Sequence, residues 1–179
     1  MQAALDRNYF EIFGLPESYR VDLSEITQRY RDLQQQLHPD RYASASEQER
    51  RLSVQMAALV NEAFQTLKDP VRRGRYLLRL RGIDTGEETD TAMDPSFLME
   101  QMELRQALDE VRYSDSPLVQ LGSLESEVSN AFDSRVKRLG ECLTSEDKGS
   151  LNSAREIVRE LQFLKKLQSE IEQLEEELV

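Results

Sequence analysis

The sequence has 179 residues, with 34 Asp and Glu against 23 Lys and Arg, a formal net charge of −11. So acidic a chain is not expected to bind nucleic acid or an anionic membrane, because both attract an excess of Lys and Arg. The one cysteine, Cys142, excludes an internal disulfide and a four-cysteine zinc site, and no apolar stretch is long enough for a secretory signal or a membrane span. We expect a cytoplasmic protein.

The composition favours an all-α fold. The chain holds 7 Gly and 5 Pro, and Leu occurs 25 times where Val and Ile together occur 15 times. Unbranched side chains keep their rotamers in a helix, whereas β-branched side chains lose them. Few turn residues and many Leu, Glu, Arg and Gln therefore predict helices joined by short connections.

The first half of the sequence predicts four helices. A short one covers residues 8–13 and ends at Gly14. Asp22 with Glu25 reads as a capping box that opens a helix over 23–37, and Ser46 with Glu49 reads as a second that opens a helix ending near Lys68. A fourth helix begins at Pro70, where the preceding aspartate caps the free N–H groups. The apolar stripes predicted for the second and third helices are Leu23, Ile26, Tyr30, Leu33 and Leu37, and Met56, Leu59 or Val60, Ala63, Phe64 and Leu67.

The second half begins with a predicted linker, residues 82–95, which is acidic and lacks apolar periodicity. Three helices follow, over 95–113, over 117–143 and from residue 144 or 145 to the end; Asp94 and Ser116 precede prolines as caps. Each helix carries an apolar stripe, and an antiparallel three-helix bundle buries all three within one chain. The stripes of the second and third of these helices are Leu121, Leu124, Val128, Phe132, Val136 and Leu139, and Ile157, Leu161, Leu164, Leu167, Ile171, Leu174 and Leu178. A longer coiled coil is the alternative for the last helix.

The helix over 95–113 is apolar on two sides. At 100° per residue, Phe97, Leu104, Leu108 and Val111 share one side, while Leu98, Met99, Met102 and Gln106 lie on the other. A helix of a three-helix bundle buries only one stripe. The second side therefore packs on the first half of the chain or binds a partner, and Phe163 at the flank of the last stripe allows the same two interpretations.

The only histidine lies in the tripeptide His38-Pro39-Asp40. Proline disfavours helical geometry at the residue before it, so the helix over 23–37 is expected to end there and leave the tripeptide in an exposed loop. The order of elements around this loop resembles the J-domain family. The resemblance covers residues 8 to about 80 and includes 8–15, Asn61-Glu62-Ala63-Phe64 and 69–76.

Similarity to J domains implies a co-chaperone, not an enzyme: such domains bind the ATP state of DnaK- or HscA-type chaperones and stimulate their ATP hydrolysis. The resemblance gives Asp40 a pairing with a chaperone arginine, and His38 and Pro39 the shaping of the loop. Arg29, Arg31 and Arg41 complete the predicted chaperone-binding set. The preceding helix has Gln28, Gln34, Gln35 and Gln36 where the family shows more cations, which predicts weaker electrostatic steering.

The second half resembles the HscB-type iron–sulfur cluster co-chaperones within that family. The similarity is carried by residues 97–105, 161–167 and 172–176. The similarity implies a J domain over 1–81, the linker over 82–95 and a scaffold-binding domain over 96–179. The chain resembles the bacterial members of the family, which implies that it binds no metal or cofactor. In such proteins the second apolar surface binds the scaffold protein IscU. By position the predicted contacts are Leu98, Met99, Met102, Glu103, Gln106 and Phe163.

The sequence leaves three alternatives to an HscB-type co-chaperone. A general J protein that serves DnaK and other clients usually has Gly/Phe-rich segments or zinc-binding cysteines, which this sequence lacks. An enzyme with His38 as general base needs a pocket and a partner group, and an exposed loop offers neither. The third is a non-catalytic helical interaction scaffold in which the tripeptide is incidental.

Overall fold

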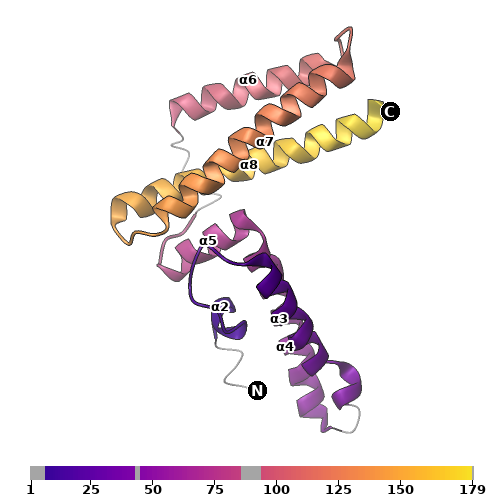
Figure 1. Cartoon of the computed structure of the whole chain (residues 1–179), viewed down its shortest axis with the longest axis vertical. Helices are drawn as coiled ribbons and strands as arrows, with labels where there is room; N and C mark the ends of the chain where they lie inside the picture. The colour runs from indigo at the N-terminus through magenta and orange to yellow at the C-terminus, as the bar shows by residue number, and fades with distance from the viewer. Residues whose placement is uncertain (1–6, 43–44, 86–93, 179) are drawn as a thin grey trace. The chain divides into compact units, whose positions relative to one another are not determined.

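The structure is a computed structural model that describes residues 7–42, 45–85 and 94–178. The described residues form helices and turns with no strand, which confirms the all-α prediction (Figure 1). None of these helices is both long and apolar enough to cross a membrane. The chain divides into two compact units, Met1–Leu77 and Leu78–Val179. Most of the predicted linker lies outside the described residues, so the boundaries at 81 and 95 stay predictions.

The first unit is built on an antiparallel hairpin of two helices, α3 and α4 (Figure 1). Its elements are α2 (Tyr9–Ile12), α3 (Leu23–Gln36), a 3₁₀ turn (Pro39–Tyr42), α4 (Glu47–Lys68) and the start of α5 (Pro70–Leu80). Ser46 and Glu49 form the predicted capping box. At α3, Asp22 accepts the N–H groups of Ser24 and Glu25 as predicted, but the Glu25 carboxylate pairs with Arg29 at 2.5 Å.

The core of this unit lies mainly on α4 and α5. Met56, Val60, Ala63 and Leu67 are buried as the spacing predicts, whereas Ile26 is the one buried residue of α3. Leu23, predicted to be part of the α3 stripe, is 53 % exposed, because it occupies the first turn at the end of the hairpin. The α3–α4 contact relies instead on flat stacking of Tyr30 on Phe64, with ring centroids 4.0 Å apart.

The second unit contains three long helices: α6 (Pro95–Val111), α7 (Pro117–Cys142) and α8 (Lys148–Leu178) (Figure 1). Asp94 caps α6 through the Ser96 N–H at 2.8 Å, as predicted. Ser116 makes no side-chain capping bond to α7, so that part of the prediction is wrong. The last helix begins at Lys148 and not at residue 144 or 145, because Asp147 accepts the Ser150 N–H at 2.9 Å and starts the helix there.

The core of the second unit follows the predicted stripes. Leu104 and Val111 of α6, Leu121, Leu124 and Val128 of α7, and Leu164, Leu167, Ile171 and Leu174 of α8 form one buried cluster. The residues that precede the predicted linker also join this unit. Arg81 donates to the carbonyl oxygens of Leu143 at 3.0 Å and Ser145 at 3.2 Å, which ties it to the α7–α8 turn.

Candidate functional site

The His-Pro-Asp tripeptide forms the turn that joins α3 to α4. Helix α3 ends at Gln36, and Pro39 opens the 3₁₀ turn. The Asp40 N–H donates to His38 Nδ1 at 3.3 Å, and the Arg41 N–H donates to the His38 carbonyl at 3.0 Å. The imidazole thus takes the place of a capping side chain. The His38 ring therefore stabilises the turn through the Asp40 N–H.

The Asp40 carboxylate projects from this turn into solvent. Its side chain is 90 % exposed, and its Oδ2 lies 3.5 Å from His38 Nδ1. This separation is too long for a strong hydrogen bond. A carboxylate that is held by its backbone and open on its outer side is suited to a bidentate bond with an arginine of another protein.

The three predicted arginines differ in their surroundings. Arg29 binds within the unit: its guanidinium donates to the Gly14 carbonyl at 2.7 Å, to the Phe13 carbonyl and to Glu25. It packs so closely that a Cβ on Gly14, whose φ is +61°, would lie 2.8 Å from Nη1. Arg31 and Arg41 are exposed on either side of the turn. Arg29 is therefore bound to the end of α2, whereas Arg31 and Arg41 face solvent.

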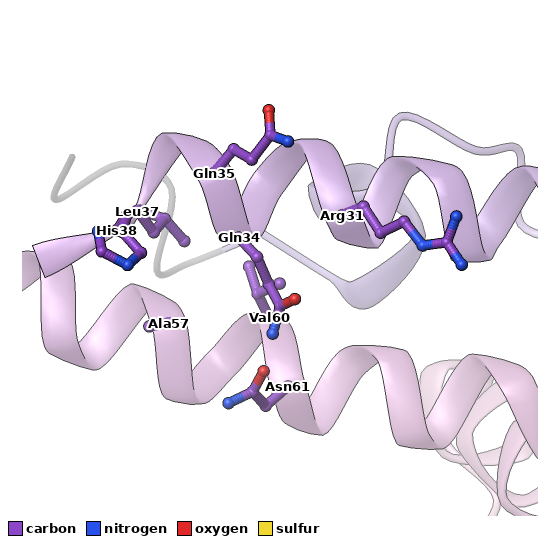
Figure 2. A pocket seen from close by; sticks show the side chains of 8 residues that line it. All are labelled: Arg31, Gln34, Gln35, Leu37, His38, Ala57, Val60 and Asn61. Carbon is purple, nitrogen blue, oxygen red and sulfur yellow. The ribbon is translucent and has the colours of Figure 1, made fainter. Parts of the chain in front are cut away.

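A groove between α3 and α4 adjoins the His-Pro-Asp turn (Figure 2). It has a volume of about 510 Å³ and is lined by Arg31, Gln34, Gln35, Leu37, His38, Ala57, Val60 and Asn61. Leu37, Ala57 and Val60 make it largely apolar, while the amides and Arg31 form a polar rim. The small side chain of Ala57 leaves this space open. The groove could not be predicted from the sequence, since an alanine on a helix face gives no signal until the facing helix is known.

A second exposed surface, which we call the α6 surface, lies on the outer side of α6. Leu98, Met99 and Met102 are 42 %, 63 % and 72 % exposed, and Glu103 and Gln106 are exposed beside them. The periodicity had placed Leu98, Met99, Met102 and Gln106 opposite Phe97 and Leu104, which are both 4 % exposed. Exposed methionines are typical of adaptable protein-binding surfaces.

Phe163 of α8 lies at the edge of the α6 surface. The ring is partly buried and meets Phe97 edge to face, with centroids 5.8 Å apart. The Arg105 guanidinium lies over the same ring at 5.4 Å, and Arg105 is two helical turns after Leu98 on the same side of α6. The structure therefore brings Phe163 to the flank where Leu98 lies, although the two residues are 65 positions apart in the sequence.

A helical hairpin closed by an exposed His-Pro-Asp turn, followed by a separate helical unit, defines a J-domain co-chaperone. The DnaJ domain model matches residues 8–76. The model of the HSCB C-terminal oligomerisation domain matches residues 93–172.

Relatives that match along nearly the whole chain identify the family. A co-chaperone protein HscB homolog of Shewanella amazonensis is 44 % identical over 96 % of this chain and 99 % of its own. The structure of chaperone HscB from Vibrio cholerae superposes with a TM-score of 0.85 at 40 % identity over 97 % and 100 % of the two chains. Human co-chaperone protein HscB superposes with a TM-score of 0.86 at 30 % identity over 95 % and 83 %. The chain belongs to the HscB co-chaperone family, which acts in iron–sulfur cluster assembly.

Proposed function

We propose that the protein stimulates ATP hydrolysis by an HscA-type chaperone and delivers the scaffold IscU to it. The observation that carries the first part is the Asp40 carboxylate, fixed by the His38-capped turn and 90 % exposed. Pairing of this carboxylate with a chaperone arginine transmits binding to the nucleotide site of the chaperone. All of the chemistry takes place in the chaperone, which agrees with membership of a co-chaperone family and not an enzyme family.

The chaperone-binding surface includes the groove beside the turn. Arg31 lies at the rim of the groove and His38 at its end. An apolar side chain of the chaperone that packs on Leu37 and Ala57 would therefore lie next to the chaperone arginine that pairs with Asp40. Arg31 and Arg41 supply the positive charge for an acidic chaperone surface, and Arg29 supports the fold behind them. Helix α3 itself contributes one exposed cation, Arg31, so we expect association to depend on apolar contact as well as on charge.

The α6 surface holds IscU. Three exposed apolar side chains on two consecutive turns, with Glu103, Gln106 and Phe163 around them, supply an apolar centre and a polar rim, as in other protein interfaces. Joining the two surfaces in one chain raises the concentration of IscU near the chaperone. The complex is placed in the cytoplasm, a reducing compartment that suits a chain with one cysteine.

The test compares two carboxylates of the first unit. Asp40→Ala should return the ATPase rate of the HscA-type chaperone to its unstimulated value while binding of IscU by calorimetry stays unchanged. The control is Asp32→Ala, which removes an exposed carboxylate of α3 that accepts a hydrogen bond from Gln28 of the same helix at 3.0 Å. Stimulation that survives in the Asp40 variant contradicts the proposal. Stimulation of DnaK and not of an HscA-type chaperone would favour the general J protein.

A further inference from the structure

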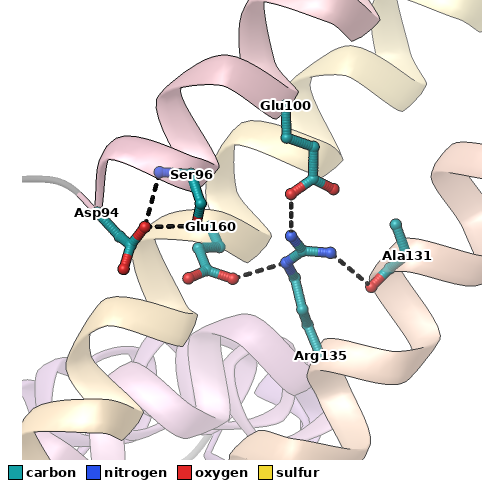
Figure 3. A network of polar contacts seen from close by, with 6 residues as sticks. All are labelled: Asp94, Ser96, Glu100, Ala131, Arg135 and Glu160. Atoms are coloured by element: carbon teal, nitrogen blue, oxygen red, sulfur yellow. Dashed lines mark hydrogen bonds and ion pairs between the residues drawn. The ribbon is translucent and has the colours of Figure 1, made fainter.

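Arg135 of α7 connects all three helices of the second unit (Figure 3). Its Nε donates to Glu160 of α8 at 2.6 Å, and its Nη2 pairs with Glu100 of α6. Its Nη1 donates to the Ala131 carbonyl at 3.3 Å, and the guanidinium lies 5.4 Å from the centre of the Phe97 ring. With 13 % of its side chain exposed, Arg135 is the centre of a mostly desolvated network.

The first two turns of α6 depend on this network. Within residues 95–103, Phe97 is the one buried residue, and the next buried residue is Leu104. Arg135 contacts both Phe97 and Glu100, which face inward there, while Leu98, Met99 and Met102 occupy the opposite side of the same turns. Whatever sets the position of Phe97 and Glu100 therefore sets the position of the exposed apolar side chains.

The charges make this dependence strong. Glu100 and Glu160 are 34 % and 16 % exposed and share one guanidinium between two helices. Without the arginine, two partly desolvated carboxylates would face each other and repel. The repulsion would push the first turns of α6 away from α8. It would therefore move the α6 surface away from Phe163, which lies on α8.

We propose that Arg135 is a positioning residue for scaffold binding: it holds the first two turns of α6 so that Leu98, Met99 and Met102 form one surface with Phe163. This proposal rests on the proposed role of the α6 surface. Arg135 does not touch the scaffold, and it acts through Phe97, which meets both the guanidinium and the Phe163 ring.

The test measures the affinity of the full chain for purified IscU by calorimetry. Arg135→Gln should weaken binding about tenfold, within the coupling energies measured between contacting residues. The control is Arg112→Gln, which removes another α6–α8 link, the more exposed 2.6 Å pair with Glu177, at the far end of α6. The control should change the affinity less than about twofold, because residues far from the surface act independently of it.

A second variant separates positioning from general loss of stability. Adding Glu160→Gln to Arg135→Gln removes one of the two facing carboxylates, and with it their repulsion. The affinity should return to within about threefold of that of the unmodified chain, although the ion pairs stay absent. Arg135→Gln should lower the melting temperature both in the unmodified chain and in a chain that already carries Leu98→Ala and Met102→Ala. In the second chain it should cause no further loss of affinity for IscU. If Arg135→Gln lowers helical content in circular dichroism, Arg135→Lys replaces it, with a smaller expected loss since one ammonium serves one carboxylate.

Three results would overturn the proposal. The first is an unchanged affinity of Arg135→Gln for IscU, measured alongside weaker binding by Leu98→Ala with Met102→Ala. The α6 surface would then bind IscU, and Arg135 would have no role in positioning it. Another is an equal loss in Arg112→Gln, which assigns the effect to general loosening of the bundle. The third is unchanged affinity when Leu98 and Met102 are replaced, because then the α6 surface itself does not bind IscU.

Discussion

The two units of this protein present their candidate binding groups in different ways. Residues 1–80 contain 12 Lys and Arg against 11 Asp and Glu and are nearly neutral, whereas residues 81–179 contain 11 against 23 and carry all of the net negative charge. The first unit exposes one carboxylate on a short turn, and the second exposes apolar side chains on the face of a long helix. A turn positions its group through backbone hydrogen bonds, whereas a helix face depends on the side chains behind it.

Arginine shows the same contrast. In the first unit, Arg29 and Arg73 donate to main-chain carbonyls: Arg29 at the end of α2, and Arg73 to the Tyr19 carbonyl at 2.8 Å. In the second unit, Arg81 also donates to main-chain carbonyls, but Arg105, Arg112 and Arg135 pair with glutamates across helices. An acidic bundle uses its few cations between helices, because the carboxylates would otherwise repel one another. The overall charge of the chain therefore says little about either surface.

The largest expected effect separates the two units completely. Leu98→Ala combined with Met102→Ala should weaken IscU binding by about 100-fold, since two exposed anchors are removed from the centre of the surface. Stimulation of the chaperone in the absence of IscU should stay unchanged. Calorimetry and a steady-state ATPase assay on the same preparation check both. A loss of both activities would show that the surfaces are not independent.

The next effect separates two neighbouring arginines of α3. Arg29→Ala should lower the free energy of unfolding by about 2 kcal/mol, because it leaves the Phe13 and Gly14 carbonyls without a charged donor. Arg31→Ala should leave stability unchanged within about 0.5 kcal/mol and reduce the affinity for the chaperone about fivefold, more at low salt. Urea denaturation and salt-dependent ATPase titrations measure the two effects. The reverse assignment would mean that Arg29 is the partner contact.

A third prediction concerns the groove beside the His-Pro-Asp turn. Ala57→Leu fills the groove and should reduce stimulation of the chaperone by about fivefold with little change in melting temperature, because the added side chain enters open space. Ala58→Leu places the same side chain on the exposed side of α4 and should have no effect. Equal stimulation by the two variants would remove the groove from the chaperone-binding surface.

The smallest effect is the acid sensitivity of the helix caps, which both units share. Hydrogen bonds from Ser24 and Ser96 lower the pKa values of Asp22 and Asp94, and those from Ser46 lower the pKa of Glu49, below their ordinary values of 3.8, 3.8 and 4.5. A lowered folded-state pKa gives stability that is complete above the ordinary value and is lost as the pH falls through the folded value. Asp22→Asn and Asp94→Asn should each flatten the fall in melting temperature below about pH 4, because the amide still accepts the capping bonds without titrating. An unchanged pH profile would contradict the capping account.

Much of the fold followed from the order of residues alone. The helix starts at Asp22, Ser46 and Asp94, the buried stripes of α4 and α8, and the two-sided character of α6 all come from spacing, because capping and amphipathic burial depend on residues within two or three turns. The His38-Pro39-Asp40 turn was predicted for the same reason, since proline acts on the residue next to it. Two predictions were wrong: Ser116 makes no side-chain capping bond to α7, and Asp147 caps α8 later in the sequence than the predicted start at residue 144 or 145.

What the sequence alone determined is which side chains lie at the surface of each helix and which residues begin it. Only the tertiary structure decided what those side chains meet. It placed Arg29 against the end of α2, opened the groove over Ala57, brought Phe163 beside Phe97, and put Arg135 between Glu100 and Glu160. These contacts join residues on different helices, and their geometry depends on how the helices pack, which no local pattern encodes.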